Sequence, residues 1–163
     1  MPAVKERPKV ELGKINKLSV LLALALNDLI RFMRMRNHKI EMNAVWLHVN
    51  DSCEPVSEFN PCEACLAGAV MYLELACPPQ SNPEPQDYDE AVSCRLMALN
   101  LLRMGAVGMA AQKLGIKTKV RDRYIPKMGS YDPREKEEWK KGMWRDWRKS
   151  MRRLLKDLKE AGE

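Results

Sequence analysis

The chain is poor in the residues that build membrane-spanning or β-rich proteins. It contains 2 Phe but 11 Met among 163 residues, and cores short of Phe and rich in Leu, Ala and Met are typical of helical proteins. Its longest apolar run, residues 20–26, falls short of the roughly 18 residues that a membrane-spanning helix requires. We therefore expect a helical protein that does not enter a membrane.

The cysteines are few and odd in number. There are five, and the charged N-terminal stretch MPAVKERPKVELGKINK shows no secretory signal. Both observations argue against a disulfide framework and predict reduced thiols in a cytosol. The sequence also lacks a Gly-rich phosphate-binding loop, a metallohydrolase spacing and any recognisable catalytic constellation. This lack favours a protein that is not an enzyme.

Hydrophobic periodicity predicts an all-α fold, with one domain of about five helices packed as an irregular bundle over residues 1–163. The expected helices cover about residues 14–37, 60–77, 89–104, 107–115 and 132–163. Residues 40–49 alternate weakly, which permits either a short strand or a bent helical piece.

Helix-start signals are clearest for the second and the last of these helices. Asn60 is a natural N-cap before Pro61, and Asp132 precedes Pro133 with Glu135 at the capping-box spacing. In the last helix we expect a buried stripe at helical spacing, with Trp144 beside it and more exposed. The stripe consists of Trp139, Met143, Trp147, Met151, Leu154 and Leu158.

Charge is distributed unevenly along the chain. Residues 1–39 carry a net +6, residues 40–100 a net −9 and residues 101–163 a net +9. Two interpretations follow from this pattern. Either folding brings the segments together so that they neutralise one another, or the ends form a basic face for nucleic acid, a nucleotide or an acidic partner.

Basic and aromatic residues alternate in two segments near the C-terminus. Cations bind phosphate and aromatic faces stack on bases, so these segments are candidates for binding an anionic ligand. The alternative is a set of core tryptophans with solvated Arg side chains around it. The candidate ligand-binding residues are Lys119, Arg121, Arg123, Tyr124, Trp144, Arg145 and Arg148.

A cysteine-rich segment offers a second candidate site. His48, Cys53, Cys62 and Cys65 have ligand types that suit a tetrahedral zinc ion, although only one CxxC pair is present. Cys62 near a helix start would also suit a redox pair, but no βαβ pattern precedes it. The remaining interpretation is that these thiols are small apolar side chains, with Ala67, Gly68 and Ala69, in a close-packed helix face.

Several segments resemble a family of small, largely uncharacterised proteins of tailed phages and prophages. The matching features are Trp46 and His48, CEACLAGAVM from Cys62, QDYDEAV from Gln86, SYDPREKEEW from Ser130 and EAG from Glu160. Ala64 and Tyr72 depart from the family pattern, which has Val and Ala there. The resemblance covers residues 46–163 and leaves residues 1–40 as an added N-terminal segment. It implies a phage accessory protein of the host cytoplasm and transfers no catalytic residue.

Three hypotheses for function remain open. The first is a non-enzymatic protein that binds and neutralises a host component, either a defence protein or an anionic nucleotide-like signal. The second is a nucleic-acid-binding protein, with zinc as an optional stabiliser. The third is a virion or assembly component that forms homo-oligomers through Met- and Leu-rich surfaces.

Overall fold

The computed structural model describes residues 9–35, 37–43, 46–49, 62–77, 83–121 and 128–163. The helices are η1 (Leu12–Lys14), α1 (Leu18–Arg34), α2 (Leu66–Glu74), η2 (Pro85–Asp87), α3 (Glu90–Arg103), α4 (Val107–Lys113) and α5 (Glu138–Glu160). The strands are β1 (His38–Glu41), β2 (Leu47–Val49), β3 (Cys62–Ala64) and β4 (Ser130–Tyr131). The described residues thus form a mostly helical single domain with five α-helices and a small mixed sheet, and the all-α prediction was wrong in omitting that sheet.

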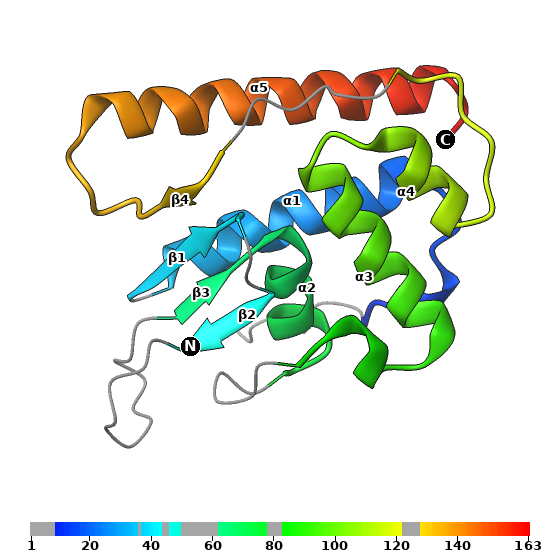
Figure 1. Ribbon diagram of the computed structural model, residues 1–163, viewed down its shortest axis with the longest axis horizontal. Coiled ribbons are helices and arrows are strands. Elements are labelled where there is room, and N and C mark those ends of the chain that lie inside the picture. The colour runs from blue at the N-terminus through cyan, green and yellow to red at the C-terminus, as the bar shows by residue number, and fades with distance from the viewer. Residues whose placement is uncertain (1–8, 36, 44–45, 50–61, 78–82, 122–127) are drawn as a thin grey trace, which may run out of the picture.

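Helix α1 lies at the centre of the domain. It packs against α2, α3, α5 and strand β1, and its buried side chains include Leu21, Leu22 and Phe32. Helix α5 runs along α1 in the opposite direction (Figure 1), and the Ser19 amide donates a hydrogen bond of 2.8 Å to the carbonyl of Glu163. Residues 1–40, which the resemblance leaves as an added N-terminal segment, therefore supply α1, the helix against which α2, α3, α5 and β1 pack.

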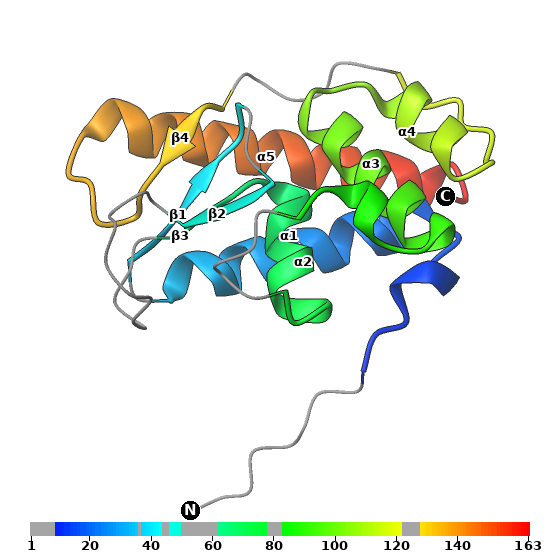
Figure 2. The same ribbon diagram turned by 60° about the horizontal axis from the view of Figure 1, so that its bottom comes forward.

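The four strands form one sheet in the order β2-β3-β1-β4. Strands β1 and β3 are parallel, whereas β2 pairs with β3 and β4 pairs with β1 in antiparallel fashion. His38 and Ile40 point into the core, while Lys39 and Glu63 lie on the other face and form an ion pair of 2.9 Å. The sheet lies beside the C-terminal half of α1, as Figure 2 shows from below.

The segment CEACLAGAVM forms a strand and then a helix, and the predicted helix start at Asn60 was therefore wrong. Cys62 lies in β3, and Cys65 is the N-cap of α2, where its Sγ accepts a hydrogen bond from the Gly68 amide at 3.4 Å. The Cys65 amide donates to the Trp46 carbonyl at 3.2 Å. A cysteine thus takes the capping role that Ser or Asp usually fills. Asn60 and Pro61 lie outside the described residues.

The close approach of the chain at Trp46 leaves no room for a side chain at Gly68. A Cβ atom at this position would lie 1.3 Å from the Trp46 carbonyl oxygen, a distance that no side chain tolerates. The prediction of a close-packing face is confirmed, but at Gly68 the approaching group is the backbone that leads into β2.

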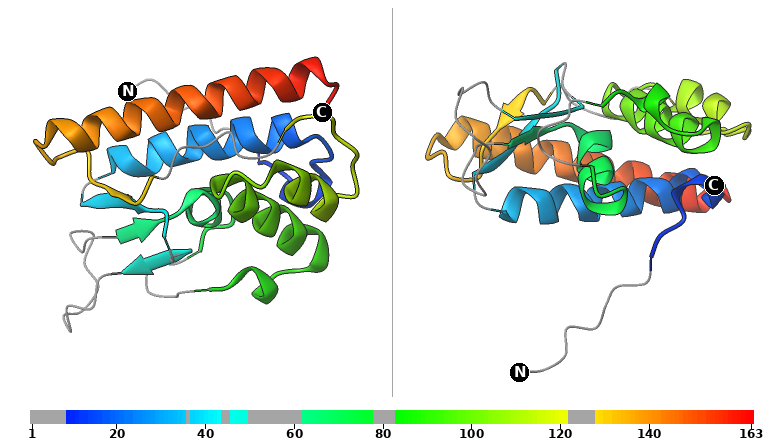
Figure 3. Two further views of the ribbon diagram at one scale, coloured as in Figure 1. Left: turned by 45° about the horizontal axis from the view of Figure 1, so that its top comes forward. Right: turned by 90° about the horizontal axis from the view of Figure 1, so that it is seen from below.

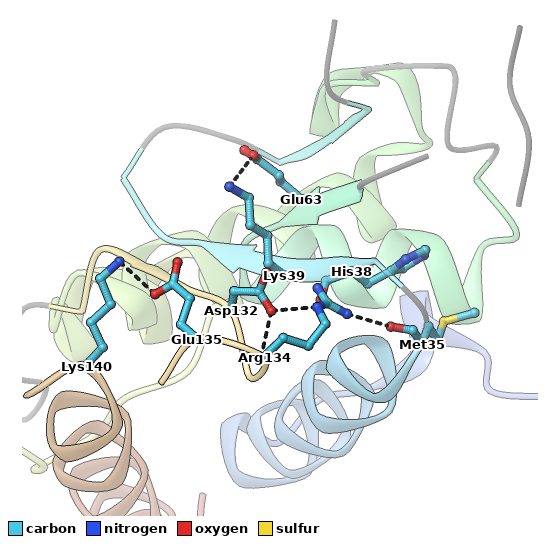
Figure 4. A network of polar contacts seen from close by, with 8 residues as sticks. All are labelled: Met35, His38, Lys39, Glu63, Asp132, Arg134, Glu135 and Lys140. Carbon is cyan, nitrogen blue, oxygen red and sulfur yellow. Dashed lines mark hydrogen bonds and ion pairs between the residues drawn. The ribbon is translucent and has the colours of Figure 1, made fainter. Parts of the chain in front are cut away.

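The predicted start of the last helix at Asp132 was wrong, because residues 132–137 make tertiary contacts instead. Asp132 accepts a hydrogen bond from the Arg134 amide at 2.9 Å, and Arg134 donates through its guanidinium to the carbonyls of His38 at 2.7 Å and Met35 at 3.4 Å. Figure 4 shows this network joining the segment before α5 to the end of α1 and to β1. Helix α5 begins only at Glu138, after this anchor.

Candidate nucleic-acid interface

The aromatic residues of α5 form a stack against β4. The rings of Tyr131 and Trp144 lie 5.4 Å apart with 10° between their planes, and those of Trp144 and Trp147 lie 5.3 Å apart with 17° between them. Trp147 is fully buried and Trp144 is 8% exposed. The stack fixes the rotation of α5 about its own axis, and with it the direction in which the charged residues of this helix point.

The buried stripe of α5 differs from the predicted one at its N-terminal end. Met151, Leu154 and Leu158 are buried as predicted, but Trp144 takes the place in the core that the sequence pattern gave to Trp139 and Met143. Trp144 is covered by Tyr131 and Trp147 and so does not present a free ring face to a base. Trp139 is 61% exposed, and sequence reasoning placed it in the buried stripe because two four-residue steps, from Trp147 through Met143 to Trp139, also fit a helix.

Trp144 nevertheless makes a contact with a neighbouring cation. The guanidinium carbon of Arg148 lies 5.6 Å from the centre of the Trp144 ring, within the range of a cation–π contact. Arg148 and Arg152 line a small groove between α5 and α1, together with Leu26, Leu29 and Ile30 of α1. Ile30 also borders a shallow surface hollow that Arg31 and Arg34 line. Arginines from the two helices are thereby brought onto one continuous surface.

We call this area the α1–α5 basic surface. Figure 3 shows from two directions that its two helices lie side by side over their length. Arg145, Arg148 and Arg152 fall on one side of α5, because steps of three, four and seven residues return to the same side of a helix. Lys149 and Arg153 follow Arg145 at steps of four residues, farther round the exposed face of α5. The α1–α5 basic surface consists of Arg31 and Arg34 of α1 and Arg145, Arg148, Lys149, Arg152 and Arg153 of α5.

Most cations of this surface have no acidic partner within the described part of the chain. There, no carboxylate lies within 4.0 Å of the charged groups of Arg34, Arg148, Lys149, Arg152 or Arg153. Arg31 is half exposed and lies 3.4 Å from the buried Asp28, and Arg145 lies 3.8 Å from Asp146. Among the described residues, these five positive charges therefore have no carboxylate contact.

The ion pairs also show how far the acidic residues 40–100 neutralise the basic residues 1–39 and 101–163. Among the described residues, one salt bridge joins the acidic middle to a basic end, between Lys39 and Glu63. The other salt bridges there join residues close in sequence. The described ion pairs of α5 use carboxylates from its own sequence or from Glu135 just before it. Contact neutralisation between distant segments is therefore slight in this part of the structure.

The other predicted ligand-binding residues are less well connected to this surface. Lys119 and Arg121 are exposed in the segment that follows α4, while Arg123 and Tyr124 lie outside the described residues. Arg145 and Arg148 belong to the basic surface as defined above. The prediction also passed over Arg31 and Arg34, whose place in the last turns of α1 is already explained by the helix dipole.

The predicted zinc ligands are not brought together in the described residues. His48 pairs with Glu63 and Val49 pairs with Cys62, so the side chains of His48 and Cys62 point to opposite faces of the sheet. The Cys65 side chain already accepts the N-cap hydrogen bond of α2, from the Gly68 amide. Cys53 lies outside the described residues, and among those described no group of three or more His, Cys, Asp or Glu could hold a metal ion.

The chemical state of the thiols points in the same direction. Burial, followed by the charge of Glu63, raises the pKa of Cys62 to about 12, and burial raises the pKa of Cys65 as well. Thiol–disulfide exchange needs the thiolate, which a lowered pKa favours. Cys62 is thus a protonated, buried side chain at neutral pH, as the structural interpretation of this segment expected.

Within the described residues, no helix is both long and apolar enough to span a bilayer. Comparison of the chain with models of known protein families, with curated proteins and with solved structures finds no match.

Proposed function

We propose that the protein binds nucleic acid through the α1–α5 basic surface, with its cations contacting backbone phosphates. The observation that carries this proposal is the set of five cations there without a carboxylate partner among the described residues. Unpaired Arg and Lys gathered on one side of a helix are the usual electrostatic footprint of a phosphate-binding protein.

The shape of the surface favours an extended polyanion over a single small anion. Arg145 and Arg153 are separated by eight residues, or roughly 12 Å along the axis of α5, and the phosphates of one strand in a duplex are spaced about 3.4 Å along the DNA axis. A row of cations of this length therefore matches about three or four phosphates. The groove between the helices is small, and Trp144 is covered, so neither offers a pocket for a whole nucleotide.

The test is an equilibrium binding measurement on two matched variants. Arg148→Gln/Arg152→Gln removes two charges from the basic surface, whereas Lys9→Gln/Lys113→Gln removes two exposed charges elsewhere. Fluorescence anisotropy with a labelled 20-nucleotide duplex and a single strand of the same length is expected to show weaker binding for the first variant only. Equal affinities of the two variants, or no binding by the parent protein at low salt, would refute the proposal.

A second candidate rests on the same cations. An anionic nucleotide-like signal would also be drawn to Arg34, Arg148 and Arg152, in keeping with the hypothesis of a protein that neutralises a host component. Thermal-shift measurements with mononucleotides and cyclic dinucleotides distinguish the two. A rise in unfolding temperature with a nucleotide, and none with an oligonucleotide of mixed sequence, would favour this second candidate.

The biological setting rests on the resemblance alone. It supports a phage accessory protein that works in the host cytoplasm, and it leaves a virion or assembly role as an alternative. Native mass spectrometry of the purified protein bears on both, because it reports stoichiometry, retained nucleic acid or a bound host protein, and any zinc in one spectrum. A strict monomer with retained oligonucleotides is the outcome that this proposal predicts.

A further inference from the structure

A second feature of α5 lies on the side of the helix away from α1. Trp139 is 61% exposed and Met143 is 37% exposed, although both are large apolar side chains. Single exposed apolar residues are ordinary, but these two border one cavity of about 290 Å³. Its other walls come from Met128, Gly129 and Ser130 at the start of β4 and from Lys140.

The surroundings of Trp139 hold its position. The Lys140 ammonium lies 5.5 Å from the centre of the Trp139 ring and 2.7 Å from a carboxylate oxygen of Glu135. The hydrogen bond to Glu135 raises the pKa of Lys140, so this ammonium stays charged beside the ring. Figure 4 shows the Lys140–Glu135 pair next to the segment that anchors the start of α5. An indole beside a fixed cation is a suitable platform for a flat, electron-rich ligand.

Gly142, which has no side chain, lies on α5 between Trp139 and the basic surface. Gly142 lies one turn beyond Trp139, and the nearest atom to a Cβ built there is the Nη2 atom of Arg145, at 3.9 Å. Arg145 therefore reaches back over Gly142 toward Trp139. Two acids of this part of α5, Glu138 and Asp146, are paired with Lys141 at 3.5 Å and with Arg145 at 3.8 Å.

We propose that Trp139 stacks on an unpaired base of single-stranded nucleic acid, whose backbone continues over Gly142 to Arg145 and the α1–α5 basic surface. This inference rests on the proposed function and specifies its substrate class. Single strands leave base faces free to stack on an aromatic side chain, whereas bases inside a duplex are already stacked on one another. An exposed aromatic ring beside a row of cations fits a single strand better than it fits an apolar protein partner.

The experiment compares three oligonucleotides of equal length: a single strand of 12 thymidines, the same backbone with abasic sites throughout, and a 12-base-pair duplex. The proteins are the parent, Trp139→Ala, Trp139→Phe and the control Met104→Ala, which removes an equally exposed apolar side chain from the end of α3. Stacking on one aromatic residue is worth about 5- to 150-fold in affinity by alanine substitution. Trp139→Ala is expected to lose such a factor on the thymidine strand, while Trp139→Phe recovers part of it.

The other two ligands separate this inference from the proposed function. For the abasic strand and the duplex, Trp139→Ala is expected to bind within twofold of the parent, because the phosphate contacts are unchanged. An equal loss on all three ligands, or no loss on the thymidine strand, would overturn the stacking role while leaving phosphate binding in place. Failure of the parent protein to bind any of the three would overturn both. Unfolding temperatures of the variants within a few degrees of the parent establish that they are folded.

Discussion

Replacing Gly68 with alanine tests the local structure that joins β3, α2 and the backbone at Trp46. The new Cβ would lie 1.3 Å from the Trp46 carbonyl oxygen and 2.4 Å from its carbon, so one of the two segments must move by about 2 Å to reach ordinary contact. Such a movement also lengthens the hydrogen bond from the Cys65 amide to the same carbonyl, now 3.2 Å.

The expected cost follows from these two effects. Overpacking costs typically about 1–3 kcal/mol, and a lost backbone hydrogen bond about 1 kcal/mol, which together give about 3 kcal/mol. For a domain of this size 1 kcal/mol corresponds to about 2–4 °C in unfolding temperature, so Gly68→Ala is expected to lower that temperature by about 6–12 °C.

Gly142→Ala is the matched control, because it makes the same chemical change inside another helix. A Cβ atom at that position would make only an ordinary contact, with Nη2 of Arg145 at 3.9 Å, so the gain in helix propensity of about 0.5–1 kcal/mol should raise the unfolding temperature. Thermal unfolding followed by circular dichroism measures both effects. If Gly68→Ala were as stable as the parent, the close approach of Trp46 to α2 would be wrong.

Two further predictions concern the core. Trp147→Ala should destabilise the protein by about 3–5 kcal/mol in urea denaturation, because this ring is fully buried in the aromatic stack, and a loss under 1 kcal/mol would contradict the stack. Cys62 has a pKa raised from 9.0 to about 12 in the folded protein, so its contribution to stability is complete below pH 9 and is lost as pH rises toward 12. Over that window the parent should lose stability more steeply than Cys62→Ala, by up to about 1.4 kcal/mol per pH unit, and parallel pH profiles would count against a buried protonated thiol.

The start of α3 and the end of α4 were predictable from the sequence, whereas the start signals at Asn60 and Asp132 were misleading. Asp89, the first residue of the helix predicted over residues 89–104, caps α3 by accepting a hydrogen bond from the Val92 amide at 3.0 Å. The turn after α4 ends with Gly115 at a φ of +70°, a conformation that glycine adopts without strain. Both features depend on residues within a few positions of each other, which is why the sequence alone was enough.

The sheet could not be predicted in the same way. Its strands are two to four residues long, so the sequence permitted a strand only in the weakly alternating residues 40–49, where β2 lies. The pairing that defines the sheet joins distant residues such as His38 and Cys62. Asn60 and Pro61 match the sequence signals of a helix start just before β3. The N-cap of α2 in the structure is Cys65, which is not a residue type that capping rules favour.

The candidate site was predictable in its charge but not in its geometry. The surplus of cations near the C-terminus is evident from composition, and Arg145 and Arg148 were identified from it. Which tryptophan is buried depends on Tyr131, which lies in β4 outside the helix and selects Trp144 by stacking on it. Only that long-range contact distinguishes Trp139 as the exposed ring of the helix.

The most direct test of phosphate binding is the salt dependence of affinity for the 20-base-pair duplex. If five of the seven cations of the basic surface contact phosphates, the plot of log K against log salt concentration should have a slope of about −4 to −5. Arg148→Gln/Arg152→Gln should reduce the magnitude of that slope by about 2, and Lys9→Gln/Lys113→Gln should leave it unchanged. A slope near zero, or the same slope for both double variants, would contradict the assignment of the α1–α5 basic surface to nucleic acid.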